Sequence, residues 1–189
     1  MKTTPVLLFY FFISSVFSQT INYNDFDEDL FDIVLIKEFN NFRRTNGLDT
    51  LVYSSSLHNS ISEPNCVEVS NSGKFYHPDI NVKWSTSGVK NQIARESNLM
   101  IGGKILKHSD GTYYMDTWEN AFRSTKKFNT YQELAKFAIY SWSQSVEHNK
   151  IQMKSFKSSG LPGMFACDTE YVNGVVFVYM NFVSIYRYN

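Results

Sequence analysis

An apolar hairpin near the C-terminus constrains the fold more than any other feature of this sequence. Two runs rich in apolar residues, 164–170 and 175–186, flank Asn173-Gly174, a dipeptide typical of tight turns between antiparallel strands. One side of the second run carries Val176, Val178, Met180 and Phe182, and further apolar residues fill its other side. A strand that is apolar on both sides must be covered on both sides. The hairpin therefore predicts a central strand rather than an edge.

Two other segments show helical spacing. Residues 25–44 begin with four acidic residues, continue with apolar residues at nearly every third or fourth position, and end with two arginines. This charge distribution favours a helix, because a helix N-terminus prefers acids and its C-terminus prefers bases. Asn46-Gly47 supplies a left-handed stop. Residues 131–145 predict the second helix, with Thr130 as its N-cap and Glu133 in the capping-box position.

The segments between these helices predict shorter elements. A short helix is expected to begin at Ser54 or Ser55, and Pro64 should end or kink it because proline lacks the N–H that a helix interior requires. Residues 92–101 predict a strand or an extended segment, and the glycine pair at 102–103 predicts a small hairpin. The whole pattern predicts an α+β fold in which helices surround a central antiparallel sheet.

The first residues and the charge balance bear on location and partners. Residues 1–18 combine Lys2 with an apolar stretch too short to span a bilayer comfortably, as in a secretory signal peptide. We expect residues 19–189 to form a single secreted, extracellular domain without an integral membrane segment. Lys plus Arg and Asp plus Glu both total 18, so the formal net charge is zero and no binding to nucleic acid is expected.

The chain contains two cysteines, Cys66 and Cys167. In an oxidising compartment they are expected to form a disulfide if their Cα atoms come within about 4.4 to 6.8 Å. Such a bond would close a loop of about 100 residues and, in the chain-entropy model, stabilise the fold by about 4 to 5 kcal/mol. The alternative is two buried free thiols.

Four short motifs follow one another along the chain. They are Asn40-Asn41-Phe42-Arg43-Arg44-Thr45-Asn46-Gly47-Leu48, Phe75-Tyr76-His77, Ala94-Arg95-Glu96-Ser97-Asn98-Leu99 and Trp142-x-x-Ser145-x-x-His148. Their order and spacing resemble the CAP superfamily, named for cysteine-rich secretory, antigen and pathogenesis-related proteins, in its short Trp-x-x-Ser-x-x-His form. The resemblance covers nearly all of residues 19–189. It implies an α-β-α sandwich with a central antiparallel sheet.

The resemblance also implies a solvent-facing cavity. It places His77, Glu96 and His148 around that cavity, with Ser145 standing where longer members carry a second glutamate. Two neutral imidazoles can bind Zn²⁺ or another divalent cation, and Glu96 is then a third ligand or an acceptor that orients a histidine. His77 and His148 are therefore the expected metal ligands. The alternative is that these residues line a cleft through hydrogen bonds alone.

Other side chains offer alternatives at this site. Ser145 and His148 lie one helical turn apart, which makes a serine nucleophile conceivable. No orienting acid or oxyanion hole accompanies them, so a helix-capping serine is the simpler interpretation. Glu119 and Glu133 are candidate replacements for the missing second carboxylate. The two remaining histidines, His58 and His108, are interpreted as surface residues.

The predicted function is extracellular binding rather than catalysis. The resemblance implies roles in defence, host interaction, reproduction or venom, with a protein or lipid partner such as a sterol or fatty acid. A protein partner would use the loops at residues 71–90 or 102–127. A lipid would need an apolar surface of the kind that an aromatic cluster in an inserted loop could line, namely Tyr113, Tyr114, Met115 and Trp118.

The alternative function is that of a metal-dependent hydrolase or protease. Two histidines and one carboxylate would hold a cation and leave one position for the attacking water. His77, Glu96 and His148 would be the residues that carry this reaction.

Overall fold

A central sheet organises the molecule. The computed structural model describes residues 19–79, 83–84, 87–158 and 160–187, so the predicted signal peptide at residues 1–18 lies outside the described residues. The strand order is β1-β5-β6-β4. These strands are β1 (Val52–Tyr53), β4 (Tyr113–Ser124), β5 (Met164–Val172) and β6 (Val175–Arg187). β6 is antiparallel to both of its neighbours, β5 and β4, and the short β1 runs parallel to β5.

The predicted hairpin is confirmed as β5 and β6. Asn173 and Gly174 connect the strands with φ angles of 52° and 79°, a left-handed conformation that asparagine and glycine tolerate best. β6 lies between β5 and β4, and it is buried from Val176 through Ile185. The apolar pattern on both sides of this run therefore identified the central strand correctly.

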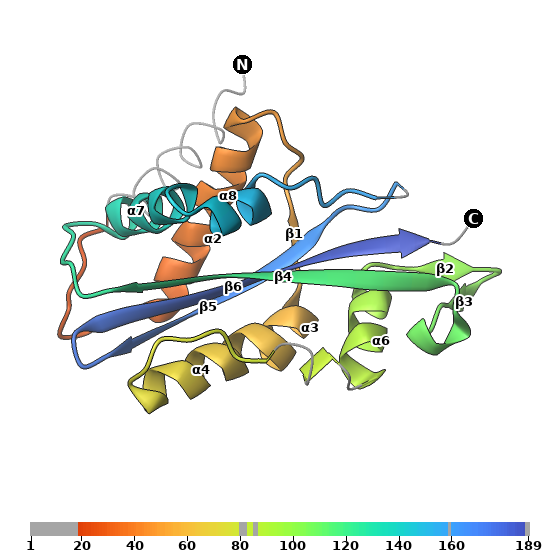
Figure 1. Ribbon diagram of the computed structural model, residues 1–189, viewed down its shortest axis with the longest axis horizontal. Helices are drawn as coiled ribbons and strands as arrows, with labels where there is room; N and C mark the ends of the chain where they lie inside the picture. The colour runs from red at the N-terminus through yellow and green to blue at the C-terminus, as the bar shows by residue number, and fades with distance from the viewer. Residues whose placement is uncertain (1–18, 80–82, 85–86, 159, 188–189) are drawn as a thin grey trace, which may run out of the picture.

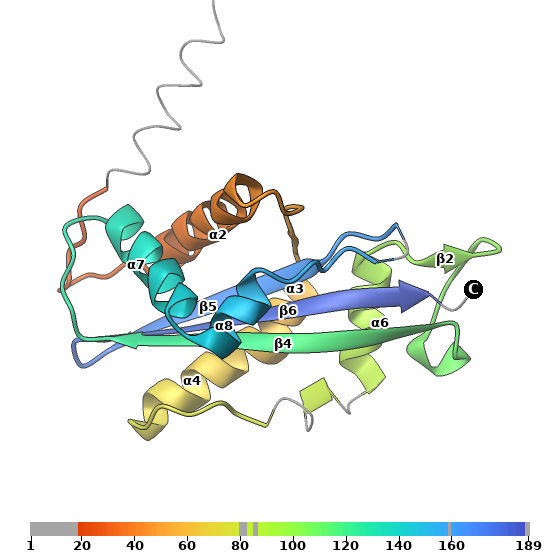
Figure 2. The same cartoon turned by 45° about the horizontal axis from the view of Figure 1, so that its top comes forward.

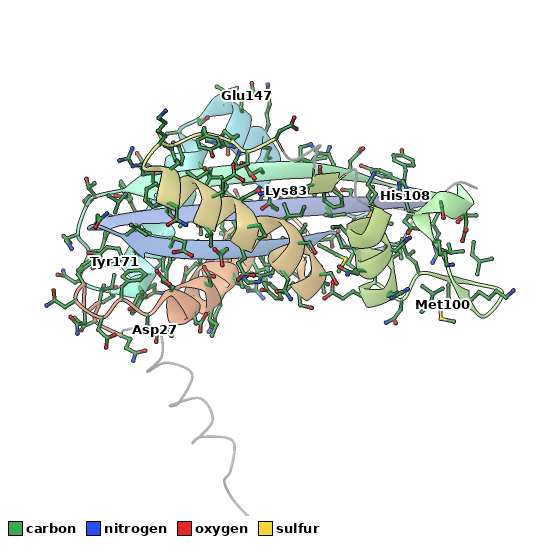
Figure 3. The ribbon with its side chains drawn as sticks, turned by 90° about the horizontal axis from the view of Figure 1, so that it is seen from below. Asp27, Lys83, Met100, His108, Glu147 and Tyr171 are labelled. Atoms are coloured by element: carbon green, nitrogen blue, oxygen red, sulfur yellow. The ribbon has the colours of Figure 1, made fainter. Side chains whose placement is uncertain are left out.

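Helices cover both faces of the sheet and complete the predicted α-β-α sandwich (Figure 1). One face carries α2 (Glu28–Thr45), α7 (Tyr131–Ser143) and α8 (Val146–Gln152). Figure 2 shows α2 and α7 side by side above the strands. The other face carries α3 (Ser55–Leu57), the π-helical turn η1 (His58–Ser62), α4 (Glu63–Ser72) and α6 (Ser87–Glu96). In Figure 3, seen from below, α4 and α6 lie in front of the sheet.

Alternation along β6 gives each face its own core. Its even-numbered side chains pack with α2 and α7, where Phe31, Phe39 and Trp142 are buried. Its odd-numbered side chains face the other helices: Phe177 and Tyr179 join Cys66 and Val69 of α4, and Val183 and Ile185 join Leu57 and Ile93. One strand thus carries the apolar contacts of both helical layers.

The two long helices begin and end at the predicted signals. Asp27 caps α2 by accepting a hydrogen bond from the backbone N–H of Leu30 (2.9 Å), and Gly47 adopts a φ of 72° just beyond its end. Before α7, the Thr130 hydroxyl oxygen accepts from the Glu133 N–H (3.2 Å), and the Glu133 carboxylate accepts from the Thr130 N–H (3.2 Å). In the described part of the chain, no helix is both long and apolar enough to cross a membrane.

Of the two predicted effects of Pro64, an end or a kink of the short helix, the end is contradicted. α3 begins after its N-cap Ser54, passes through η1, and continues into α4 as far as Ser72. Pro64 lies in the first turn of α4, where the missing N–H and the fixed φ of proline are tolerated. The π-helical turn η1, immediately before Pro64, interrupts the regular α-helical hydrogen bonds at this point.

The prediction of a strand over residues 92–101 was also wrong for most of its length. This segment continues α6, because Val89, Ile93 and Ala94 form a buried stripe at helical spacing. The helix ends before Asn98, which has a φ of 50°. The small hairpin that follows is confirmed, since β2 (Met100–Ile101) and β3 (Lys104–Ile105) pair across the glycines.

The expected disulfide is not formed. Cys66 and Cys167 are both free and buried. Cys66 belongs to the apolar cluster between α4 and the sheet, whereas Cys167 belongs to the cluster on the α2 side. Burial raises the pKa of both thiols. The alternative of two buried free thiols therefore describes this structure, and the fold relies on packing rather than on a covalent crosslink.

A buried arginine connects the end of α2 to the segment after α8. Arg43 is fully buried, and its Nε donates to the carbonyl oxygen of Asp49 (2.9 Å). Its Nη1 donates to the carbonyl oxygens of Gln152 (2.8 Å) and Lys154 (3.0 Å). The guanidinium carbon lies 5.2 Å from the ring centroid of Phe156. Burial lowers the pKa of Arg43 to about 10, so the group stays charged at neutral pH.

Replacing this arginine should destabilise the protein strongly. Arg43→Met keeps most of the side-chain volume but leaves buried carbonyl oxygens without a donor, and we expect the free energy of unfolding to fall by about 3 kcal/mol. Urea denaturation measures this loss. Arg44→Met is the matched control, because Arg44 is exposed and should change stability by no more than about 0.5 kcal/mol. Equal effects of the two substitutions would contradict the assigned role.

Candidate functional site

The structure brings the two predicted histidine ligands together. The ring centroids of His77, in the segment after α4, and His148, on α8, are 5.8 Å apart. Between these segments β4 contributes Glu119, whose Oε1 lies 2.7 Å from Nδ1 of His77. We call His77, Glu119 and His148 the histidine cluster.

The carboxylate of Glu119 is held in place by amide donors. Its side chain is only 7% exposed. Its Oε2 accepts from Nδ2 of Asn65 on α4 and from Nδ2 of Asn181 on β6, both at 2.9 Å. Asn181 is the residue that pairs with Glu119 across β4 and β6. Donors on two other elements thus fix the orientation of Glu119, and Glu119 in turn fixes the ring of His77.

The two imidazoles have opposite electrostatic environments. The hydrogen bond to Glu119 raises the pKa of His77, whereas burial, together with the nearby His77, lowers the pKa of His148. His148 is therefore neutral at pH 7 and can donate a nitrogen lone pair. Because Nδ1 of His77 faces Glu119, its Nε2 is the nitrogen left for another partner. The arrangement is that of two imidazoles of which one is oriented by a carboxylate.

Ser145 serves as a helix cap, as the simpler interpretation of the sequence expected. Its side chain accepts from the backbone N–H of His148 (3.5 Å) at the start of α8. It therefore helps to place the backbone of His148. Glu133, the other candidate carboxylate, is occupied in the capping box of α7.

Glu96 lies in a different environment from the one that the resemblance implied. Its carboxylate accepts from the hydroxyls of Ser54 (2.5 Å) and Ser55 (2.6 Å) and from the N–H of Ser55 (2.7 Å), at the start of α3. Burial raises the pKa of Glu96, but these hydrogen bonds outweigh it and lower the pKa below the ordinary value. Glu119, not Glu96, is the carboxylate in contact with His77. The sequence analysis named Glu119 as a candidate replacement carboxylate, and the register of β4 against β6 and the packing of α4 place it beside His77.

A second polar cluster, which the sequence analysis did not find, lies at the edge of β5. It contains Asp32 of α2, His58 of η1 and Asp168 of β5, and we call it the edge cluster. Nε2 of His58 is 3.2 Å from Oδ1 of Asp168. One ligand atom from each residue lies within 4.8 Å of the others, so this triad could hold a metal ion. No motif joins these positions, and His58 had been interpreted as a surface residue.

Burial and proximity shift the protonation of the edge cluster. The hydrogen bond to Asp168 raises the pKa of His58 to about 9. Burial raises the pKa of Asp32 to about 7, against the opposing effect of a hydrogen bond from Thr169. Protons are therefore retained within the cluster at pH values where such groups in water would have released them.

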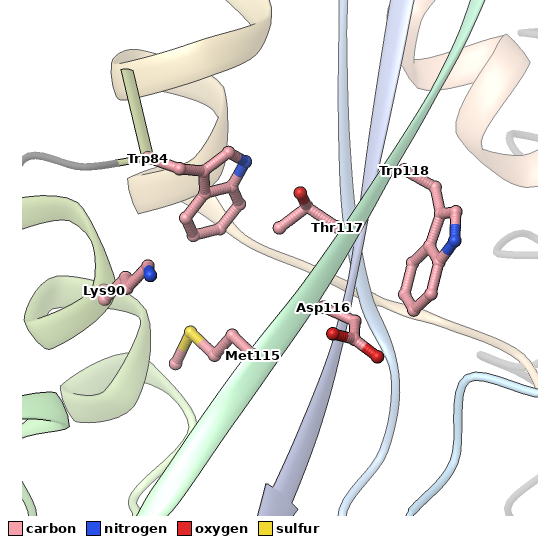
Figure 4. Close-up of a pocket in the computed structure, with 6 residues that line it drawn as sticks. All are labelled: Trp84, Lys90, Met115, Asp116, Thr117 and Trp118. Carbon is pink, nitrogen blue, oxygen red and sulfur yellow. The ribbon is translucent and has the colours of Figure 1, made fainter. Parts of the chain in front are cut away.

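A pocket of about 460 Å³ wraps around the outer edge of β4 (Figure 4). Trp84, Met115 and Thr117 lie on one side of the strand, and Asp116 and Trp118 lie on the other. Lys90 completes the lining.

The predicted aromatic surface is only partly present, and its residues lie on a strand rather than in an inserted loop. Tyr113 is buried, and Tyr114 stacks on Tyr186 with ring centroids 4.7 Å apart. Met115 and Trp118 therefore line a pocket of mixed polarity rather than a continuous apolar groove.

Comparison with a solved structure supports the fold. No family model and no curated protein sequence matches the chain. An outer surface protein from Borrelia burgdorferi is similar in structure, with a TM-score of 0.51, 10% identity, and coverage of 90% of this chain and 99% of that one. A cysteine-rich secretory protein from Staphylococcus aureus is matched with a TM-score of 0.49, 18% identity and coverage of 84% of this chain. The match spans only 39% of that staphylococcal chain.

The role of Glu96 in stabilising the start of α3 leads to a pH-dependent prediction. Because its pKa is lower in the folded state, its contribution is present above about pH 4.5, the ordinary value, and is lost as the pH falls through the folded pKa. At pH 7, Glu96→Gln should lower the free energy of unfolding by about 1 to 2 kcal/mol.

Denaturant unfolding at pH 7 and at pH 3 measures this effect. The difference between the two proteins should shrink at pH 3. Glu147→Gln is the control, because Glu147 is exposed and its ion pair with Lys150 contributes little at either pH. If Glu96→Gln lowered the free energy of unfolding equally at both pH values, the charge of Glu96 would not be the source of the stabilisation.

Proposed function

We propose that this chain is an extracellular, CAP-like protein that functions by binding rather than by catalysis, through the histidine cluster. The convergence of His77 and His148, from two segments far apart in the sequence, is the observation that carries this proposal. The α-β-α sandwich and the order of the four motifs support it. The secretory character of residues 1–18 supports an extracellular location.

The histidine cluster is suited to a divalent cation such as Zn²⁺. Nε2 of His77 and the neutral imidazole of His148 provide two nitrogen ligands. Glu119 acts as the acceptor that orients His77, the role that the sequence analysis had given to Glu96. Two protein ligands leave coordination positions open, so a side chain of a bound protein could complete the site. The cation would then help to hold a partner.

The pocket at β4 is the second part of the proposed binding surface. Its volume of about 460 Å³ falls within the range typical of small-ligand sites. Trp84 and Trp118 offer aromatic faces, while Lys90 and Asp116 offer charge. This lining suits an amphipathic ligand, for example a sterol or fatty acid with its polar end at Lys90.

The hydrolase alternative receives less support from the geometry. It requires Glu96 beside His77 and His148, but three serine residues occupy the Glu96 carboxylate. The carboxylate that does contact His77 is held by two asparagines. A carboxylate held by these donors is suited to orienting the ring of His77.

Zinc titration tests the proposed cation site. His77→Ala and His148→Ala should each weaken one class of Zn²⁺ binding by at least about 10-fold, because each removes a ligand from a site that has only two. Isothermal titration calorimetry at pH 7.5 measures this change. His108→Ala is the matched control, since His108 lies on the separate turn His108–Asp110 and should leave the affinity unchanged. Equal affinity in all four proteins would refute the site.

A further inference from the structure

The edge cluster lies where the sheet has no further strand. β1 pairs with β5 only at Met164 and Phe165, so in the described residues the outer edge of β5 is free of strand pairing at Asp168. α2 approaches this edge from one face with Asp32, and η1 approaches from the other face with His58. Three elements from distant parts of the chain therefore direct ligand atoms to one point.

His58 is held with one nitrogen directed into the cluster. Its Nδ1 lies 2.9 Å from Oδ1 of Asn59. An amide oxygen can only accept, so Nδ1 carries a proton, and Nε2 is the atom that faces Asp168. Metal-binding histidines typically donate their other ring N–H in this way. His58 also begins a π-helical turn, a distortion that frequently occurs at functional sites.

The two carboxylates are held differently. Oδ1 of Asp32 accepts from the Thr169 hydroxyl at 2.5 Å, which orients the group. Asp168 is only 9% exposed, and within the described residues no hydrogen bond of normal geometry reaches its Oδ2. The Cys66 thiol also lies close enough to interact with Asp168, but its hydrogen bond goes to the carbonyl oxygen of Phe177 (3.6 Å). A buried carboxylate oxygen without a donor is unfavourable, and this one points to a missing cationic partner.

The donor set defines the class of ion. One imidazole nitrogen and two carboxylate groups suit a borderline or hard divalent cation better than a soft, thiolate-preferring one. Two carboxylates also outweigh the charge of one histidine, so a divalent ion would complete the charge balance. The His58 side chain is 23% exposed, which leaves a route for the ion and an open position for water.

We infer that the edge cluster is a binding site for a divalent transition-metal cation of the Zn²⁺ or Mn²⁺ class. Nε2 of His58 and the carboxylates of Asp32 and Asp168 are its ligands, and Asn59 and Thr169 orient the first two. The ion binds an ionised carboxylate and an unprotonated Nε2, so any proton that Asp32 or Nε2 of His58 carries is released to solvent on binding. The site is separate from the histidine cluster and does not depend on the proposed function.

Equilibrium dialysis against Zn²⁺ and electron paramagnetic resonance of bound Mn²⁺ test the inference. The proteins are the wild type, Asp168→Asn, His58→Gln, and the double variant His77→Ala/His148→Ala. Asp168→Asn and His58→Gln should each abolish saturable binding at the edge cluster. The double variant should retain that binding and lose only the binding of the histidine cluster. Failure of one site is therefore distinguishable from failure of the other.

A thermal unfolding assay provides an independent readout. Zn²⁺ should raise the unfolding midpoint of the double variant and have no such effect when Asp168→Asn is added to it. Asn59→Ala keeps the inference testable if the ligand variants fail to fold. It removes only the partner that orients His58 and should weaken binding by about 10- to 100-fold. The inference is overturned if Asp168→Asn, His58→Gln and Asn59→Ala all bind both ions as the wild type does.

Discussion

Burial of β6 on both faces is the constraint on which the rest of the structure depends. The strand pairs with β4 from Val176 to Arg187 and with β5 from Val175 to Val183. Because its successive side chains point to opposite faces, each helical layer must pack onto alternate residues of the same strand. Loss of either layer would expose a continuous apolar row, so the two layers are coupled through a single strand.

Both polar clusters take their positions from the register of this sheet. Asn181 of β6 lies opposite Glu119 of β4, which places an amide donor beside the carboxylate that orients His77. Asp168 of β5 lies opposite Tyr179 of β6 and beyond the end of β1. The polar groups therefore lie at the margins of an apolar sheet, where hydrogen bonds offset the cost of burying them.

The clusters differ in how completely their carboxylates are satisfied, and this difference separates their chemistry. Glu119 receives amide hydrogen bonds and a histidine, so it is a rigid support for the ring of His77. Asp168 has one oxygen at His58 and another that lacks a donor within the described residues. A carboxylate whose oxygens both accept hydrogen bonds orients its neighbour. A buried carboxylate with one oxygen lacking a donor is better stabilised by a cation.

The sequence by itself determined the elements whose signals are local. These are the turn at Asn173-Gly174, the two-sided strand that follows it, and α2 and α7 with their caps. The tertiary structure decided which distant side chains meet: Glu119 rather than Glu96 beside His77, His58 between two aspartates, and two cysteines in separate cores. Spacing along a chain encodes which face of a helix or strand a residue occupies. The distance between two such faces depends on strand register and layer packing, which no local pattern contains.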